Sequence, residues 1–172
     1  NVAVGKDALK DNTTGSNSTA VGTYALQNAT TAVQNTALGY DSLGNTTTGS
    51  NNTAVGYEAL EYNTTGYLNV AVGYEALTNN TEGLSNVAIG GEALRLNTTG
   101  DYNVGVGIYA LDACTTGNDN VGIGKHAAGG VTTASGNVAV GKEALMTTST
   151  GQNNTAVGTN ALRSNTTAQE NN

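Results

Sequence analysis

Residues 52–66 read NTAVGYEALEYNTTG, and nearly the whole chain is built from variations on this stretch. Its glycine, Gly56, follows an aliphatic residue, and an equivalent glycine recurs every seventeen residues in both directions. Ten copies without an insertion or deletion indicate equivalent places in a stack, because the loops of an isolated domain tolerate changes of length. The spacing therefore predicts a solenoid. The ten glycines are Gly5, Gly22, Gly39, Gly56, Gly73, Gly90, Gly107, Gly124, Gly141 and Gly158.

The composition agrees with a thin, periodic core. The 172 residues include no Pro, Trp or Phe, and Gly alone accounts for 24 of them. The apolar residues are mostly Ala, Val and Leu, so a thick core of large side chains cannot be assembled. Disorder is excluded as well, since the apolar residues keep fixed places in the repeat and a net charge of −7 is small for this length.

The charge pattern excludes two classes of partner. Only six Lys or Arg are present against thirteen Asp or Glu, which leaves no basic footprint for nucleic acid or an anionic membrane. No apolar run approaches the length of a membrane span, so we expect no membrane insertion. The chain starts in repeat register without an initiator Met. We expect residues 1–172 to be a single repeat array and a fragment of a longer fibre protein.

We number the seventeen positions of each repeat from Asn1 and call the ten residues at one position a column. Columns 2 to 4 form a short β-branched run that ends at the glycine, which predicts a strand of about four residues. Column 4 is always aliphatic and is expected to face the solenoid interior. Column 3 should then face outward. Its members are all Ala or Gly, so we expect another chain to approach them closely: Ala3, Ala20, Ala37, Ala54, Ala71, Ala88, Gly105, Gly122, Ala139 and Ala156.

The rest of the repeat supplies turns. Columns 8 and 9 are almost always Ala-Leu, which fits either one helical turn or a second short strand after a bend. The repeat closes with Asn-Thr-Thr-Gly, as at residues 12–15 and 63–66, a combination typical of turns. Stacked copies lie about 4.8 Å apart, so Asn and Thr side chains are expected to form hydrogen-bonded ladders along a rod about 50 Å long.

Runs such as NTAVGYEAL at residues 52–60 and NVAVGYEAL at residues 69–77 carry a family resemblance over the whole chain. They resemble the repeats in the heads of trimeric autotransporter adhesins, and more closely the repeat arrays of phage and bacterial tail-fibre-like proteins. The resemblance implies an all-β β-roll that packs as a parallel homotrimer around a threefold axis, with small residues at the centre. The adhesin repeat is usually about fourteen residues, so the cross-section of a seventeen-residue turn differs.

No set of residues predicts catalysis. His126 lacks a Cys or carboxylate at ligand spacing, and Cys114 lacks a nearby His, so we expect no enzyme, no metal and no cofactor. Tyr40, Tyr57 and Tyr74 share column 6 of three consecutive repeats and are expected to stack outward as a ladder. Such a ladder either stabilises the stack or offers a contact for a glycan.

These observations lead to one function and one rival. We expect a structural and adhesive extracellular fibre segment on a virion tail or a bacterial surface. It would act as a rigid spacer and could contact a host-surface receptor or polysaccharide. The rival is an ice-binding or surface-binding solenoid that uses the Thr residues of columns 13 and 14. Adjacent residues of a strand point to opposite sides, which counts against a flat Thr face.

Overall fold

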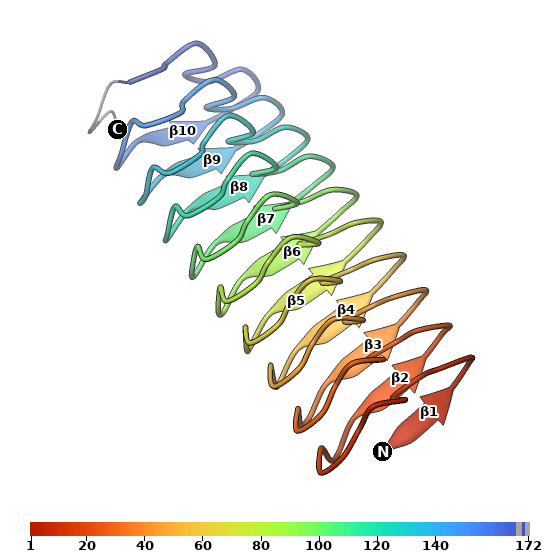
Figure 1. Ribbon diagram of the computed structural model, residues 1–172. Coiled ribbons are helices and arrows are strands. Elements are labelled where there is room, and N and C mark those ends of the chain that lie inside the picture. The colour runs from red at the N-terminus through yellow and green to blue at the C-terminus, as the bar shows by residue number, and fades with distance from the viewer. Residues whose placement is uncertain (168–169, 171–172) are drawn as a thin grey trace.

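The computed structural model describes residues 1–167 and 170, and it shows a rod wound from ten stacked coils (Figure 1). The ten strands lie side by side along one flank of the rod, and the first and last of them lie at its opposite ends. The described residues contain no helix. The strands are β1 (Val2–Val4), β2 (Thr19–Val21), β3 (Thr36–Leu38), β4 (Thr53–Val55), β5 (Val70–Val72), β6 (Val87–Ile89), β7 (Val104–Val106), β8 (Val121–Ile123), β9 (Val138–Val140) and β10 (Thr155–Val157).

One repeat makes one turn, as the spacing predicts. Each strand pairs in parallel with the strands of the repeats before and after it, in the order β1 to β10. Val55 of β4 lies opposite Val72 of β5, and the same column-to-column register holds at every pair described. Like residues therefore stack along the whole rod, and the chain is a parallel β-solenoid.

Backbone hydrogen bonds between coils are not confined to the three-residue strands. The N–H of Leu60 donates to the carbonyl of Ala76 at 3.0 Å, and the N–H of Thr64 donates to that of Thr81 at 3.1 Å. These residues lie in turns, yet they bond to the next coil as strand residues do. Buried backbone groups must be paired. These hydrogen bonds between coils supply the partners outside the strands, so each coil can be compact although only three of its residues are in a strand.

The structure reverses the predicted orientation of column 3. The side chains of Ala54 and Ala71 are fully buried within the single chain. A Cβ added to Gly105 would lie 3.3 Å from Cγ of Leu94, which is itself a core residue. The expectation that column 3 meets another chain is therefore wrong, since it lies against the chain's own leucines. The same inward position holds for Ala20, Ala37, Ala88, Gly122, Ala139 and Ala156, and only Ala3, in the first coil, is exposed.

Column 4 is reversed too, because alternate residues of a strand face opposite ways. Leu38 is 47% exposed and Ile89 is 41% exposed, and no described member of the column is buried. The narrow interior has room only for Ala or Gly opposite the Leu of column 9. The larger aliphatic side chains of the strand therefore lie on the outside of the rod.

Columns 7 to 9 are neither a helical turn nor a second strand. They form a tight turn in which Glu58 and Leu60 both have positive φ, at 52° and 53°. A left-handed conformation is unfavourable for a leucine, by about 1–2 kcal/mol. Here it turns Leu60 inward, where its side chain is fully buried and its N–H is bonded to the next coil. The equivalent residue of every repeat has the same conformation, at Leu9, Leu26, Leu43, Leu77, Leu94, Leu111, Ala128, Leu145 and Leu162.

The predicted Asn and Thr ladders are present. The buried Asn52 of column 1 accepts through Oδ1 a hydrogen bond from the N–H of Asn69 at 2.9 Å, and its Nδ2 donates to the carbonyl of Gly66 at 2.9 Å. In column 13, the hydroxyl of Thr64 donates to the carbonyl of Thr81 at 2.9 Å. The same contacts recur from coil to coil, so polar side chains hold the solenoid together from within.

Candidate functional site

The most unusual surface of the rod is the outer side of its sheet, which we call the sheet face and define as columns 2 and 4. In repeats 5 to 9 both columns are entirely aliphatic, and none of these side chains is buried. Aliphatic residues scattered singly on a surface are ordinary, whereas contiguous sets are less common and are often found at interaction surfaces. The aliphatic part of the sheet face consists of Val70, Val72, Val87, Ile89, Val104, Val106, Val121, Ile123, Val138 and Val140.

A signal for this face was available in the sequence. Column 2 carries threonine in four repeats, at Thr19, Thr36, Thr53 and Thr155. A position that holds Val in some repeats and Thr in others is typical of a partly solvated strand face. Column 4 lies on the same side of the strand as column 2. Column 4 is nevertheless predicted to face the interior, because all its residues are aliphatic and aliphatic residues are usually assigned to a core.

Large exposed side chains also precede the strands in the middle of the rod. Tyr67 is 45% exposed, Leu68 is 52% exposed and Tyr102 is 55% exposed, all in columns 16 and 17. Leu68 and Tyr102 each lie directly before the column-1 Asn that leads into a strand. These side chains add exposed aromatic and aliphatic surface just before strands that carry the sheet face.

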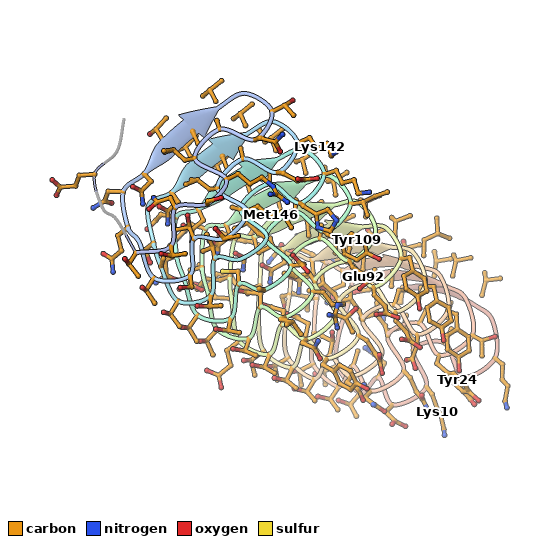
Figure 2. All side chains as sticks on the ribbon, turned by 90° about the horizontal axis from the view of Figure 1, so that it is seen from above. Lys10, Tyr24, Glu92, Tyr109, Lys142 and Met146 are labelled. Carbon is orange, nitrogen blue, oxygen red and sulfur yellow. The ribbon has the colours of Figure 1, made fainter. Side chains whose placement is uncertain are left out.

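The tyrosines of column 6 stack as predicted. The rings of Tyr40 and Tyr57 have centroids 5.2 Å apart, those of Tyr57 and Tyr74 are 5.5 Å apart, and each pair is within 9° of parallel. Tyr24, which is labelled in Figure 2, packs edge-on against Tyr40 with ring centroids 5.7 Å apart. The two faces of Tyr57 are thus covered by its neighbours. The stacking stabilises the coils, and a glycan could reach a ring face only at the Tyr74 end.

Carboxylates line up beside these rings. A hydrogen bond with Glu58 raises the pKa of Tyr57 to about 12, and one with Glu75 raises the pKa of Tyr74. Further along the rod, Tyr109 and Glu92 lie next to each other (Figure 2), and their hydrogen bond raises the pKa of Tyr109. The phenols are therefore un-ionised donors, which suits a structural ladder and gives no nucleophile.

His126 and Cys114 occupy structural places. The ring of His126 stacks on that of Tyr109, with centroids 4.9 Å apart and planes within 11°. Burial raises the pKa of the Cys114 thiol to about 11, so the reactive thiolate is disfavoured. Among residues 1–167 and 170, no three His, Cys, Asp or Glu side chains gather as metal ligands would. His126 is therefore a stacking partner of Tyr109, and Cys114 is a buried residue of the core.

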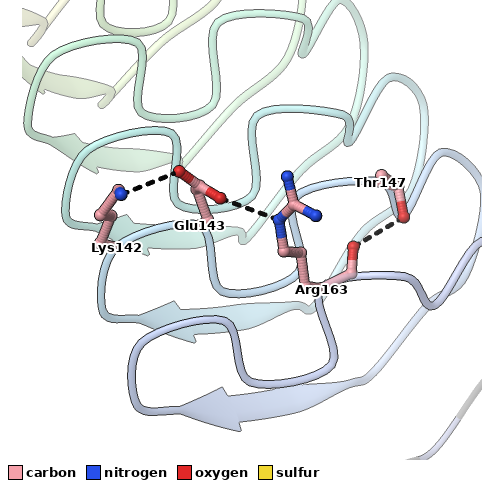
Figure 3. A network of polar contacts seen from close by, with 4 residues as sticks. All are labelled: Lys142, Glu143, Thr147 and Arg163. Carbon is pink, nitrogen blue, oxygen red and sulfur yellow. Dashed lines mark hydrogen bonds and ion pairs between the residues drawn. The ribbon is translucent and has the colours of Figure 1, made fainter.

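Charged side chains join the last coils. Glu143 of repeat 9 accepts from Nζ of Lys142 at 3.2 Å and from Nε of Arg163 at 2.8 Å, as Figure 3 shows. The hydrogen bond from Lys142 is the main cause of the lowered pKa of Glu143. Arg163 belongs to repeat 10, so this pair links two coils where the aromatic ladder is absent. As a surface contact it contributes little to stability.

Comparison of the chain with models of known protein families, with curated proteins and with solved structures finds no match. Within the described part of the chain, no helix is long and apolar enough to cross a membrane. The fold and its surfaces define a parallel β-solenoid repeat protein with one exposed aliphatic sheet face.

Proposed function

We propose that this chain is a segment of a structural, adhesive extracellular fibre, in which three copies associate through the sheet face around a threefold axis. The rod would be a rigid spacer that holds a receptor-contacting element away from a virion or a bacterial surface. The observation that carries the proposal is the exposed aliphatic face of repeats 5 to 9. The resemblance of the repeats to adhesin heads and tail-fibre arrays supports association of three chains and an extracellular location.

A second copy of the chain is the partner that fits this face best. Its aliphatic side chains protrude at the coil spacing, and another copy of the same solenoid has the same spacing over the same length. Coils about 4.8 Å apart and strands about 10 Å long make the face roughly 450 Å². Three such faces would remove roughly 1,300 Å² from water in the whole trimer, which is about 450 Å² for each pair of chains. The sheet face alone is therefore smaller than a stable two-chain interface of about 1,200–2,000 Å², so the exposed Leu68 and Tyr102 beside it would have to enlarge each contact.

Val72→Lys combined with Val106→Lys is expected to convert the assembly into folded monomers. Both side chains point outward, so the charges stay solvated in the monomer but would be buried without partners in the assembly. Sedimentation velocity should show three times the chain mass for the natural sequence and one chain mass for the variant. The circular dichroism spectrum should be unchanged.

Two controls accompany this test. Thr65→Lys with Thr99→Lys adds the same charges to exposed positions of column 14 and should leave the assembly intact. Ala71→Leu should instead lower the stability of the fold itself, by about 1–3 kcal/mol, because it overpacks a buried position. A natural chain that sediments as a stable monomer would refute the proposal, and a dimer would refute the threefold part of it.

One observation favours the rival function. Columns 13 and 14 lie in a bend rather than a strand, so adjacent threonines do not alternate between inside and outside. Thr64 is half-buried and Thr65 is exposed, so both reach the surface of the rod. Strand alternation therefore does not count against a Thr face on this rod. An ice-binding or surface-binding solenoid remains the alternative proposal.

We expect no thermal hysteresis from this rod. The column-13 hydroxyls donate to backbone carbonyls of the next coil, as Thr98 does to Thr115 at 3.0 Å, and Glu82 interrupts column 14. The measurement is a nanolitre osmometer comparison of the natural chain with the Thr65→Lys, Thr99→Lys variant. A hysteresis gap that the natural chain shows and the variant loses would favour the ice-binding alternative.

A further inference from the structure

A groove crosses the middle of the rod on the Asn-Thr-Thr-Gly side of the coil. Its volume is about 490 Å³, and it is shallow and open to solvent rather than enclosed. It is formed by columns 11 and 13 of four consecutive repeats, so every coil contributes only one or two side chains. The residues that line it are Tyr62, Asn79, Thr81, Leu96, Thr98 and Thr115.

The groove exists because one small side chain lies between two large ones. Column 11 carries Tyr62, Asn79 and Leu96 in repeats 4 to 6, and the other members of that column are all small or polar. The side chains of Tyr62 and Leu96 form two walls two coils apart, with the shorter Asn79 between them. Tyr62 borders the groove and is 45% exposed, so its ring is accessible to a ligand.

The floor of the groove is apolar although it is built from threonines. The hydroxyl of Thr81 donates to the carbonyl of Thr98 at 3.1 Å, and the hydroxyl of Thr115 donates to that of Thr132 at 3.2 Å. Since each hydroxyl is turned toward the next coil, the methyl group is the branch left to line the groove. The result is a row of methyl groups at the coil spacing beside an aromatic ring.

A few polar groups border this apolar surface, and none of the lining residues is charged. The amide Nδ2 of Asn79 donates to the carbonyl of Arg95 at 2.9 Å, which leaves Oδ1 as the hydrogen-bond acceptor of that side chain. The phenol of Tyr62 is hydrogen-bonded to Glu61. The neighbouring Glu61 and Glu82, together with the acidic net charge, disfavour an anionic ligand.

We propose that this groove binds a neutral sugar ring, seated between Tyr62 and Leu96 on the threonine methyls, with its hydroxyls at Asn79 and the phenol of Tyr62. A pyranose ring combines an apolar C–H face with a hydroxyl rim, and the groove combines an apolar floor with polar groups at its border. A purely aromatic ligand would leave the amide oxygen of Asn79 without a donor, which costs binding free energy when that group is covered.

The groove lies away from the proposed assembly surface. Leu94 of column 9 packs inward against Gly105 of column 3, so the segment that follows Leu94 lies across the core from the strands. Assembly through the sheet face would leave the groove open in every copy. Sugar binding and assembly therefore rest on different surfaces, and either can fail while the other holds.

The test is a methyl-region NMR titration of the full chain with methyl β-glucoside, methyl β-galactoside and N-acetylglucosamine oligomers. We expect shifts confined to Leu96 and to Thr81, Thr98 and Thr115. Tyr62→Asn should weaken binding by about fivefold or more, because ring contacts are worth about 1 kcal/mol. Column 11 already accepts Asn in repeats 2, 3 and 5, so this variant should fold.

Asn79→Leu should fill the groove and abolish the shifts. The matched control is Tyr67→Asn, which removes a tyrosine of equal exposure, 45%, from another column and should bind as the natural chain does. The proposal is overturned if none of these sugars shifts the groove methyls. It is also overturned if Asn79→Leu binds normally, or if an uncharged aromatic probe such as benzyl alcohol binds as tightly as the sugars.

Discussion

Gly56→Ala is expected to destabilise the rod by about 3 kcal/mol or more, the range of severe backbone and packing defects. Gly56 has φ of 141°, a conformation that residues with a side chain rarely adopt. A Cβ on it would lie 2.2 Å from the carbonyl oxygen of Gly73 in the next coil. That oxygen belongs to the stacked backbone, so it cannot move aside without separating the coils.

The matched control is Gly91→Ala, in column 6, directly after the repeat glycine Gly90. A Cβ on Gly91 would meet no atom within 4 Å, and other repeats carry Lys, Thr, Tyr or Ile at this place. Thermal unfolding followed by circular dichroism should show a lowered transition for Gly56→Ala and an unchanged one for Gly91→Ala. Equal transitions for the two variants would contradict the close packing of the glycine column.

Asn69→Ala is expected to cost about 2–6 kcal/mol, because it leaves two buried backbone groups without partners at about 1–3 kcal/mol each. The Oδ1 of Asn69 accepts from the N–H of Asn86 at 2.9 Å, and its Nδ2 donates to the carbonyl of Gly83 at 2.8 Å. All three residues are buried. Urea unfolding should show the loss. Asn79→Ala, at a half-buried residue whose amide donates one bond, should cost less than 1 kcal/mol, roughly one exposed hydrogen bond.

Asn69→Asp distinguishes the two bonds through pH. The carboxylate keeps the acceptor for Asn86 but loses the donor to Gly83, and burial raises its pKa above the ordinary value of about 3.9. The folded state then binds more protons than the unfolded state between these two pKa values. The variant should therefore be most stable at low pH, where a protonated oxygen can donate to Gly83, and should lose stability as pH rises. A flat pH profile relative to the natural chain would contradict this account.

The sequence by itself determined the architecture along the rod. An interval of seventeen residues repeated without a gap allows only one register, because any other pairing would bring unlike residues together between coils. From that register follow the pairing of Val55 with Val72, the ladder of Asn52 and Asn69, and the stacking of Tyr57 on its neighbours. Each is a contact between equivalent positions, so periodicity was sufficient to predict it.

Only the tertiary structure decided which side of each strand is inside. Alternation shows that columns 3 and 4 face opposite ways, but residue type alone assigned the larger aliphatic residues to the core. The coil is too narrow for that assignment, because the leucine of column 9 fills the interior and leaves space opposite for no more than Ala54 or Gly105. The left-handed conformation of Leu60 was also beyond prediction, since its local cost is offset by burial and a bond to the next coil. The groove at Asn79 was also beyond prediction. It depends on the shape of the coil in cross-section, because that shape decides which columns lie next to each other on the surface.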